Sequence, residues 1–149
     1  MTDEEYIEKV LDYIEDKNKD KDPKDWNKQD DTIGYVCQII SILGNVHDTM
    51  DIGIYLSSTS KDAFYEIGAK AYGDAFEKCY NDIRQASENT KGFWIFKTVN
   101  FKKQYNKHIK ALYETLQEIE STDPVIENYL LPYMKKHYSK VVKVVSDEK

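Results

Sequence analysis

The chain has 149 residues and a formal net charge of −6, with two cysteines and three histidines. A chain of this length fits one domain and buries about two-thirds of its unfolded surface, so it needs no disulfide or metal to be stable. Two cysteines are too few for a disulfide framework, and both are expected to be buried free thiols.

The charge is unevenly distributed and argues against nucleic acid as a partner. Residues 1–31 hold 12 Asp or Glu against 6 Lys or Arg, whereas residues 93–149 hold 7 against 10. An acidic N-terminal part repels phosphate backbones and attracts basic partners. Arg84 is the only arginine, although arginine is the residue that most often reads phosphates and guanines.

No part of the sequence is expected to enter a membrane. The N-terminus is charged from Asp3 onward, which is unlike a secretory signal. The most apolar run is interrupted by His47, Asp48 and Asp51, so it is too short to span a bilayer. We therefore expect a cytoplasmic protein.

The N-terminal part predicts one short helix and a charged loop. Thr2 and Glu5 form a capping box, which predicts a helix over 3–16. Residues 17–31 are rich in Lys, Asp and Asn and contain Trp26 as their only large apolar residue. Such a composition buries too little surface to offset its ordering entropy, which predicts a mobile loop.

The most apolar stretch predicts a central helix over about 32–50, begun by Asp30 or Asp31 as N-cap. Two stripes of apolar residues run along it at helical spacing: Ile33, Val36, Cys37, Ile40 and Leu43 in one, Ile39, Ile42 and Val46 in the other. A helix with two stripes is surrounded by protein on more than one side. We expect the other helices to pack against it.

Three further helices are predicted, at 61–88, 95–120 and 124–145. Gly68 and Gly73 lie inside the first of these and could interrupt it. The last is expected to be capped by Asp123 and to kink at Pro132. The predicted fold is thus an all-α, single-domain bundle of about five helices covering 1–149.

No pattern in the sequence indicates catalysis, a metal or a cofactor. His47 and Asp51 are four residues apart and could supply two metal ligands, but no further ligand accompanies them and a polar helix end is the simpler interpretation. No nucleophile motif, phosphate-binding loop or dinucleotide fingerprint is present. We therefore do not expect an enzyme.

Two groups of aromatic residues are candidates for binding a partner. Phe93, Trp94 and Phe96 surround Ile95 in a run that cannot all face one side of a helix. Trp26 stands alone in the charged loop. One interpretation places both groups in the core, with Trp26 folded back to cap the bundle and the run at 93–96 closing one end of it. The other places them on the surface as anchors for a partner, a role that Trp and Phe commonly have in protein interfaces. The acidic residues expected to steer the encounter are Asp20, Asp22, Asp25, Asp30 and Asp31.

The leading hypothesis is a non-catalytic module that binds a basic protein, such as a small acidic inhibitor, an immunity protein or an antagonist. An alternative is a ligand- or cofactor-binding bundle in which His108 and His137 face each other. A third is a homodimer through the helix at 95–120, whose apolar residues follow a seam.

Overall fold

The computed structural model describes residues 1–44, 52–56, 58–89 and 94–147, with the backbone alone at 58, 89, 94–99 and 144–147. Within these ranges the chain is helical and contains no strand, which confirms the predicted all-α bundle. The elements are α1 (Asp3–Asn18), η1 (Pro23–Asp25), α2 (Lys28–Leu43), α3 (Ser58–Glu66), α4 (Lys70–Asn89), α5 (Trp94–Thr122), η3 (Ile126–Leu130) and α6 (Leu131–Asp147).

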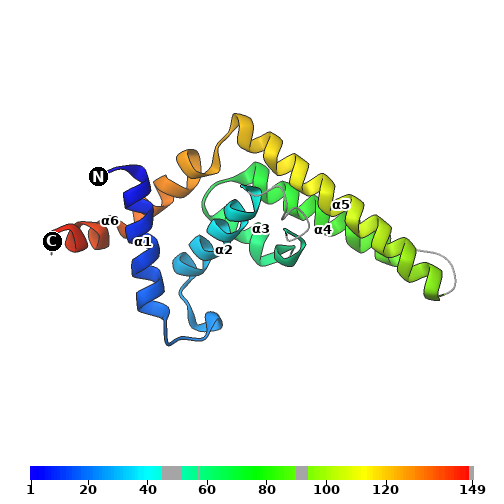
Figure 1. The fold of residues 1–149 in the computed structure, drawn as a ribbon, viewed down its shortest axis with the longest axis horizontal. Helices are drawn as coiled ribbons and strands as arrows, with labels where there is room; N and C mark the ends of the chain where they lie inside the picture. The colour runs from blue at the N-terminus through cyan, green and yellow to red at the C-terminus, as the bar shows by residue number, and fades with distance from the viewer. Residues whose placement is uncertain (45–51, 57, 90–93, 148–149) are drawn as a thin grey trace.

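The helices are arranged along one long axis (Figure 1). The antiparallel helices α4 and α5 form a long arm at one end, and α1 packs across α6 at the other. Helices α2 and α3 lie between these two pairs, and α2 contacts both α3 and α5. Both ends of the chain lie on the α1–α6 side.

The first two helices begin at different kinds of cap. In α1 the predicted capping box is present, because Glu5 N donates to Thr2 Oγ1 at 3.1 Å and Thr2 N donates to Glu5 Oε2 at 2.9 Å. Helix α2 begins earlier than predicted, at Lys28, because Asn27 Oδ1 accepts the N–H of Asp30 at 2.8 Å. Asp30 is therefore in the first turn of α2 and is not its cap.

The predicted loop at 17–31 is shorter than expected and contains structure. Helix α1 continues to Asn18, η1 occupies Pro23–Asp25, and α2 has begun by Lys28. The predicted central helix also ends earlier than expected, at Leu43 with Gly44 as its C-cap. Residues 45–51 lie outside the described part of the chain.

The predicted helix at 61–88 is two helices, α3 and α4, that meet at Gly68. Gly68 has φ of +88°, a left-handed conformation that favours glycine. Its N–H donates to Tyr65 O at 3.0 Å, and Ala69 N donates to Phe64 O at 2.9 Å, which closes the end of α3. The break lets α3 fold back against α4.

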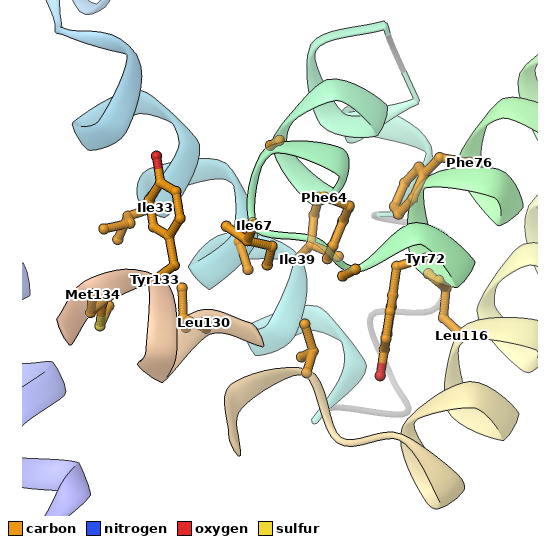
Figure 2. Packing of buried hydrophobic residues seen from close by; sticks show 14 of the residues in the cluster. Ile33, Ile39, Phe64, Ile67, Tyr72, Phe76, Leu116, Leu130, Tyr133 and Met134 are labelled. Carbon is orange, nitrogen blue, oxygen red and sulfur yellow. The ribbon is translucent and has the colours of Figure 1, made fainter. Parts of the chain in front are cut away.

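The largest buried side chains lie in α3 and α4. Phe64 stacks on both Tyr72 and Phe76, with ring centroids 5.4 Å apart in each pair. Figure 2 shows that the hydrophobic core extends from these three rings past Ile39 and Ile33 of α2 to Tyr133 and Met134 of α6. Helix α2 buries Ile33, Val36 and Ile39 completely, so both predicted stripes contribute to the core. The other described members of the stripes are only partly buried: Cys37, Ile40, Ile42 and Leu43.

Asp30 is the charged residue at the centre of the junction between α1, α2 and α6. It is 0% exposed, and its carboxylate accepts hydrogen bonds from Tyr138 Oη at 2.5 Å and Asn18 Nδ2 at 3.0 Å. Lys17 Nζ lies 2.9 Å from the same carboxylate. Burial opposes ionisation, but these hydrogen bonds and the charge of Lys17 outweigh it and hold the pKa of Asp30 below its ordinary value of 3.8.

A second polar cluster fixes the turn from α5 to α6. Glu120 accepts hydrogen bonds from Tyr72 Oη at 2.5 Å and from Val125 N at 3.0 Å. The carboxylate of Asp123 is expected to cap the last helix by accepting a backbone N–H, but it instead accepts from the side chains of Asn128 (Nδ2, 2.7 Å) and Tyr129 (Oη, 2.5 Å). The chain then passes through the π-helical η3.

The last helix is irregular before its proline. The π-helical turn Ile126–Leu130 ends where α6 begins, so regular α-helical geometry is interrupted ahead of Pro132. The valine-rich segment at 141–145 belongs to α6, as expected from the lack of a partner strand in the sequence.

Gly73 provides a test of the packing between α3 and α4. A Cβ atom at this position would lie 2.5 Å from the ring of Tyr65, whose hydroxyl is held by Asp74 and Glu77. Gly73→Ala should therefore lower the free energy of unfolding by about 1–3 kcal/mol in urea denaturation. Without a steric clash, the same change inside a helix would stabilise the protein by about 1 kcal/mol. The sign of the measured change therefore shows whether the ring of Tyr65 clashes with a side chain at position 73. In a Tyr65→Ala background, Gly73→Ala should be stabilising.

Asp30→Asn should lower the free energy of unfolding by about 2–3 kcal/mol at neutral pH, because it removes a buried charge on which three donors converge. The depressed pKa means that the contribution of Asp30 is fully present above pH 3.8 and is lost as the pH falls through the lower folded-state value. At acidic pH the free energy of unfolding should therefore fall less steeply with decreasing pH in the variant than in the parent. Asp16→Asn, which removes an exposed pair on α1, is the control and should leave the profile unchanged.

Candidate functional site

An open groove of about 670 Å³ lies between the chain that connects α1 to α2, the first half of α2, the short segment 52–55 and the start of α3. Its volume falls within the range of ligand pockets, on the order of 300–1,000 Å³. The residues that line it are Pro23, Trp26, Asp31, Gly34, Tyr35, Gln38, Ile54, Tyr55 and Thr59. We refer to it as the Trp26 groove.

The local sequence brings Trp26 onto α2. Asp22 caps η1 by accepting the N–H of Lys24 at 3.1 Å, and Pro23 occupies the first turn. The chain therefore turns back, and Trp26 N donates to Pro23 O at 3.3 Å. A Cβ atom added at Gly34 would lie 3.6 Å from the indole, an ordinary van der Waals distance, so the ring lies against this turn of α2.

Aromatic and apolar groups form most of the remaining wall. The rings of Tyr35 and Tyr55 are perpendicular, with centroids 6.5 Å apart. Ile54 is 76% exposed, the highest exposure of any large hydrophobic residue in the described ranges. Exposed apolar surface next to a cavity is typical of binding sites.

Asp31 is the one acidic or basic residue among the described residues that line the groove. Its half-buried carboxylate has no hydrogen bond or ion pair with any residue that the structure describes. Partial burial raises the pKa of Asp31 above its ordinary value of 3.8. Asp30 differs from Asp31, because the carboxylate of Asp30 accepts from three donors.

The structure divides the predicted acidic residues into three groups. Asp20, Asp22 and Asp25 are exposed on the connection between α1 and α2, next to the groove. Asp31 lines the groove itself. The prediction that Asp30 lies on the surface is wrong, because its hydrogen bonds to α1 and α6 place it in the core.

The two predicted aromatic anchors are not in one place. Trp26 lines the groove near the middle of the molecule, whereas α5 begins at the free end of the long arm (Figure 1). Phe93 lies outside the described residues. Trp94 and Phe96 are in the first turn of α5, where the structure describes the backbone alone. The described backbone thus separates the groove from the first turn of α5.

Seven of the nine lining residues were not predicted as a site, among them Tyr35, Gln38, Ile54 and Tyr55. Tyr35 and Gln38 sit one turn apart on a helix that sequence periodicity assigns to the core. Ile54 and Tyr55 belong to a segment that reads as an apolar connector. Nothing in the sequence indicates that the two segments meet at Trp26.

The histidines predicted to face each other line different cavities. His108 borders a space of about 70 Å³ between α4 and α5, with Cys79 and Asp82. His137 borders a space of about 250 Å³ at the α1–α6 junction, with Tyr13 and Lys17 among its neighbours. The geometry therefore does not provide a paired-histidine site.

The thiols show no sign of activation. Burial raises the pKa of Cys37 and of Cys79 to about 11, so both remain protonated at neutral pH. Cys79 Sγ lies 3.5 Å from His108 O, a backbone contact. In the described part of the chain, no group of three or more His, Cys, Asp or Glu side chains is placed to hold a metal ion.

Comparison of the chain with protein-family models, with curated proteins and with solved structures finds no match. Among the residues described, no helix is both long and apolar enough to cross a membrane.

Asp31→Asn should leave the unfolding midpoint at neutral pH unchanged or slightly raised. The raised pKa means that folding favours the protonated form, so the contribution of Asp31 is present below pH 3.8 and is lost as the pH rises through the folded-state value. Removing the charge therefore has the opposite consequence to removing that of Asp30. Thermal unfolding of the two variants side by side checks this, and a large loss of stability in Asp31→Asn would reveal a hidden partner.

Proposed function

We propose that this protein is a non-catalytic binding module, of the inhibitor, immunity-protein or antagonist type, that receives a basic partner protein at the Trp26 groove. The observation that carries the proposal is an open aromatic cavity whose one carboxylate is unpaired among the described residues. Aromatic side chains supply most of the binding energy in protein interfaces, and an unpaired carboxylate favours a cationic partner.

Two polar groups beside the groove lack partners within the described structure. The indole N–H of Trp26 is buried without an acceptor, and the Asp31 carboxylate has no donor. The Asp31 carboxylate is partly exposed, so water reaches it in the unbound protein and a donor from a partner can replace that water. The indole N–H of Trp26 is buried and is not exposed to a partner.

The acidic N-terminal part of the chain supports the same direction of binding. Its excess charge lies in residues 1–16, which hold seven Asp or Glu against one Lys, whereas residues 17–31, which include the connection that forms one wall of the groove, hold five Asp and five Lys. The negative charge of α1 accelerates encounter with basic proteins, and this effect weakens with added salt.

Selection of random displayed peptides on the immobilised protein tests the proposal. The recovered peptides should be enriched in Lys and Arg, and their binding should weaken with ionic strength. Trp26→Ala should reduce their affinity at least roughly tenfold because it removes the aromatic anchor.

Two lysine substitutions separate binding from stability in the same experiment. Ile54→Lys places a cation at the exposed rim of the groove and should weaken basic peptides without changing the unfolding midpoint. Tyr80→Lys, at an exposed position on α4 outside the groove lining, is the matched control and should bind like the parent. Peptides without excess positive charge, or peptides that bind Ile54→Lys as well as the parent, would contradict the proposal.

A further inference from the structure

Resting on the proposed function, we infer that the Trp26 groove holds the guanidinium group of an arginine side chain from the partner. The assignment depends on three aromatic residues and one carboxylate lining the same cavity: Trp26, Tyr35, Tyr55 and Asp31. A guanidinium is planar, stacks on aromatic faces and presents paired donors that match a carboxylate.

Each part of the wall contributes to this choice of ligand. The indole and phenol rings attract a cation through their electron-rich faces, and Trp is the most effective of these rings. Asp31 disfavours a purely apolar occupant, because covering its carboxylate without a donor would bury an unpaired charge. It also disfavours phosphate and other anions, which it repels.

None of the described residues that line the groove carries a positive charge. Lys28 Nζ lies 3.1 Å from Glu66 Oε2, and Lys17 Nζ lies 2.9 Å from Asp30 Oδ2. Lys21 and Lys24 are exposed on the connection between α1 and α2, and Arg84 is on α4, but none of the three is a lining residue. The cation in this assignment is therefore supplied by the partner.

Arginine suits this cavity better than lysine does. An ammonium group is strongly hydrated and binds as a compact point charge, whereas a guanidinium is weakly hydrated and spreads over the rings. The neutral side chain of Gln38 at the wall adds a carbonyl that can accept another guanidinium N–H. The partner therefore presents an arginine with short flanking residues in an accessible segment.

A fluorescence titration with matched peptides tests the inference. The probes are blocked peptides of glycine with one central residue, which is arginine, lysine or the neutral arginine isostere citrulline. The protein carries Trp94→Phe, so that Trp26 is its only tryptophan and reports occupation of the groove. The arginine peptide should bind at least roughly tenfold more tightly than the citrulline peptide and more tightly than the lysine peptide.

Asp31→Asn should remove most of the preference for arginine over citrulline while leaving the rings in place. Glu114→Gln, which neutralises an exposed carboxylate on α5 that does not line the groove, should preserve the preference. Equal binding of arginine and citrulline, or of arginine and lysine, would overturn the guanidinium assignment. Failure of the arginine peptide alongside successful binding of displayed basic peptides would also overturn it and leave the proposed function intact. If the displayed peptides also fail to bind, both the guanidinium assignment and the proposed function are wrong.

Discussion

The buried carboxylate of Asp30 is the interaction on which the arrangement of the outer helices depends. It lies in the first turn of α2, yet its three donors come from α1 and α6, which are at opposite ends of the sequence. An ionised carboxylate in a protein interior is tolerated only when donors surround it, so these helices are required to meet where α2 begins. The hydrophobic contacts between α1 and α6 then complete a junction whose position is already fixed.

This constraint also explains why the neighbouring Asp31 is available. Successive residues on a helix point about 100° apart, so a helix that directs Asp30 into the core turns Asp31 toward its flank. There the indole of Trp26 and the segment 52–55 form the neighbouring walls of the open groove. Two adjacent carboxylates thus have opposite properties: one holds helices together, and the other remains unpaired among the described residues at the edge of an aromatic groove.

Local patterns in the sequence predict the fold well where a single segment determines the outcome. The capping box at Thr2, the seam of α5 through Ile109, Leu112 and Leu116, and the absence of strands in the described ranges follow from periodicity and capping. The break at Gly68 is visible in the sequence only as a weak point, because a glycine inside a helix does not reveal whether the chain turns there. The π-helical turn before α6 has no local signature.

The candidate site is less predictable because it depends on contacts between distant segments. Trp26 stands out as an aromatic residue in a charged segment, but its neighbours in space come from α2, the segment 52–55 and the start of α3. Asp30 and Asp31 look alike in the sequence, and only the positions of Asn18 and Tyr138 distinguish them. The hydrogen bond between Tyr138 and Asp30 spans 108 residues. Such a separation means that this junction closes late during synthesis on the ribosome, since α1 lacks its packing partner until the last helix has emerged.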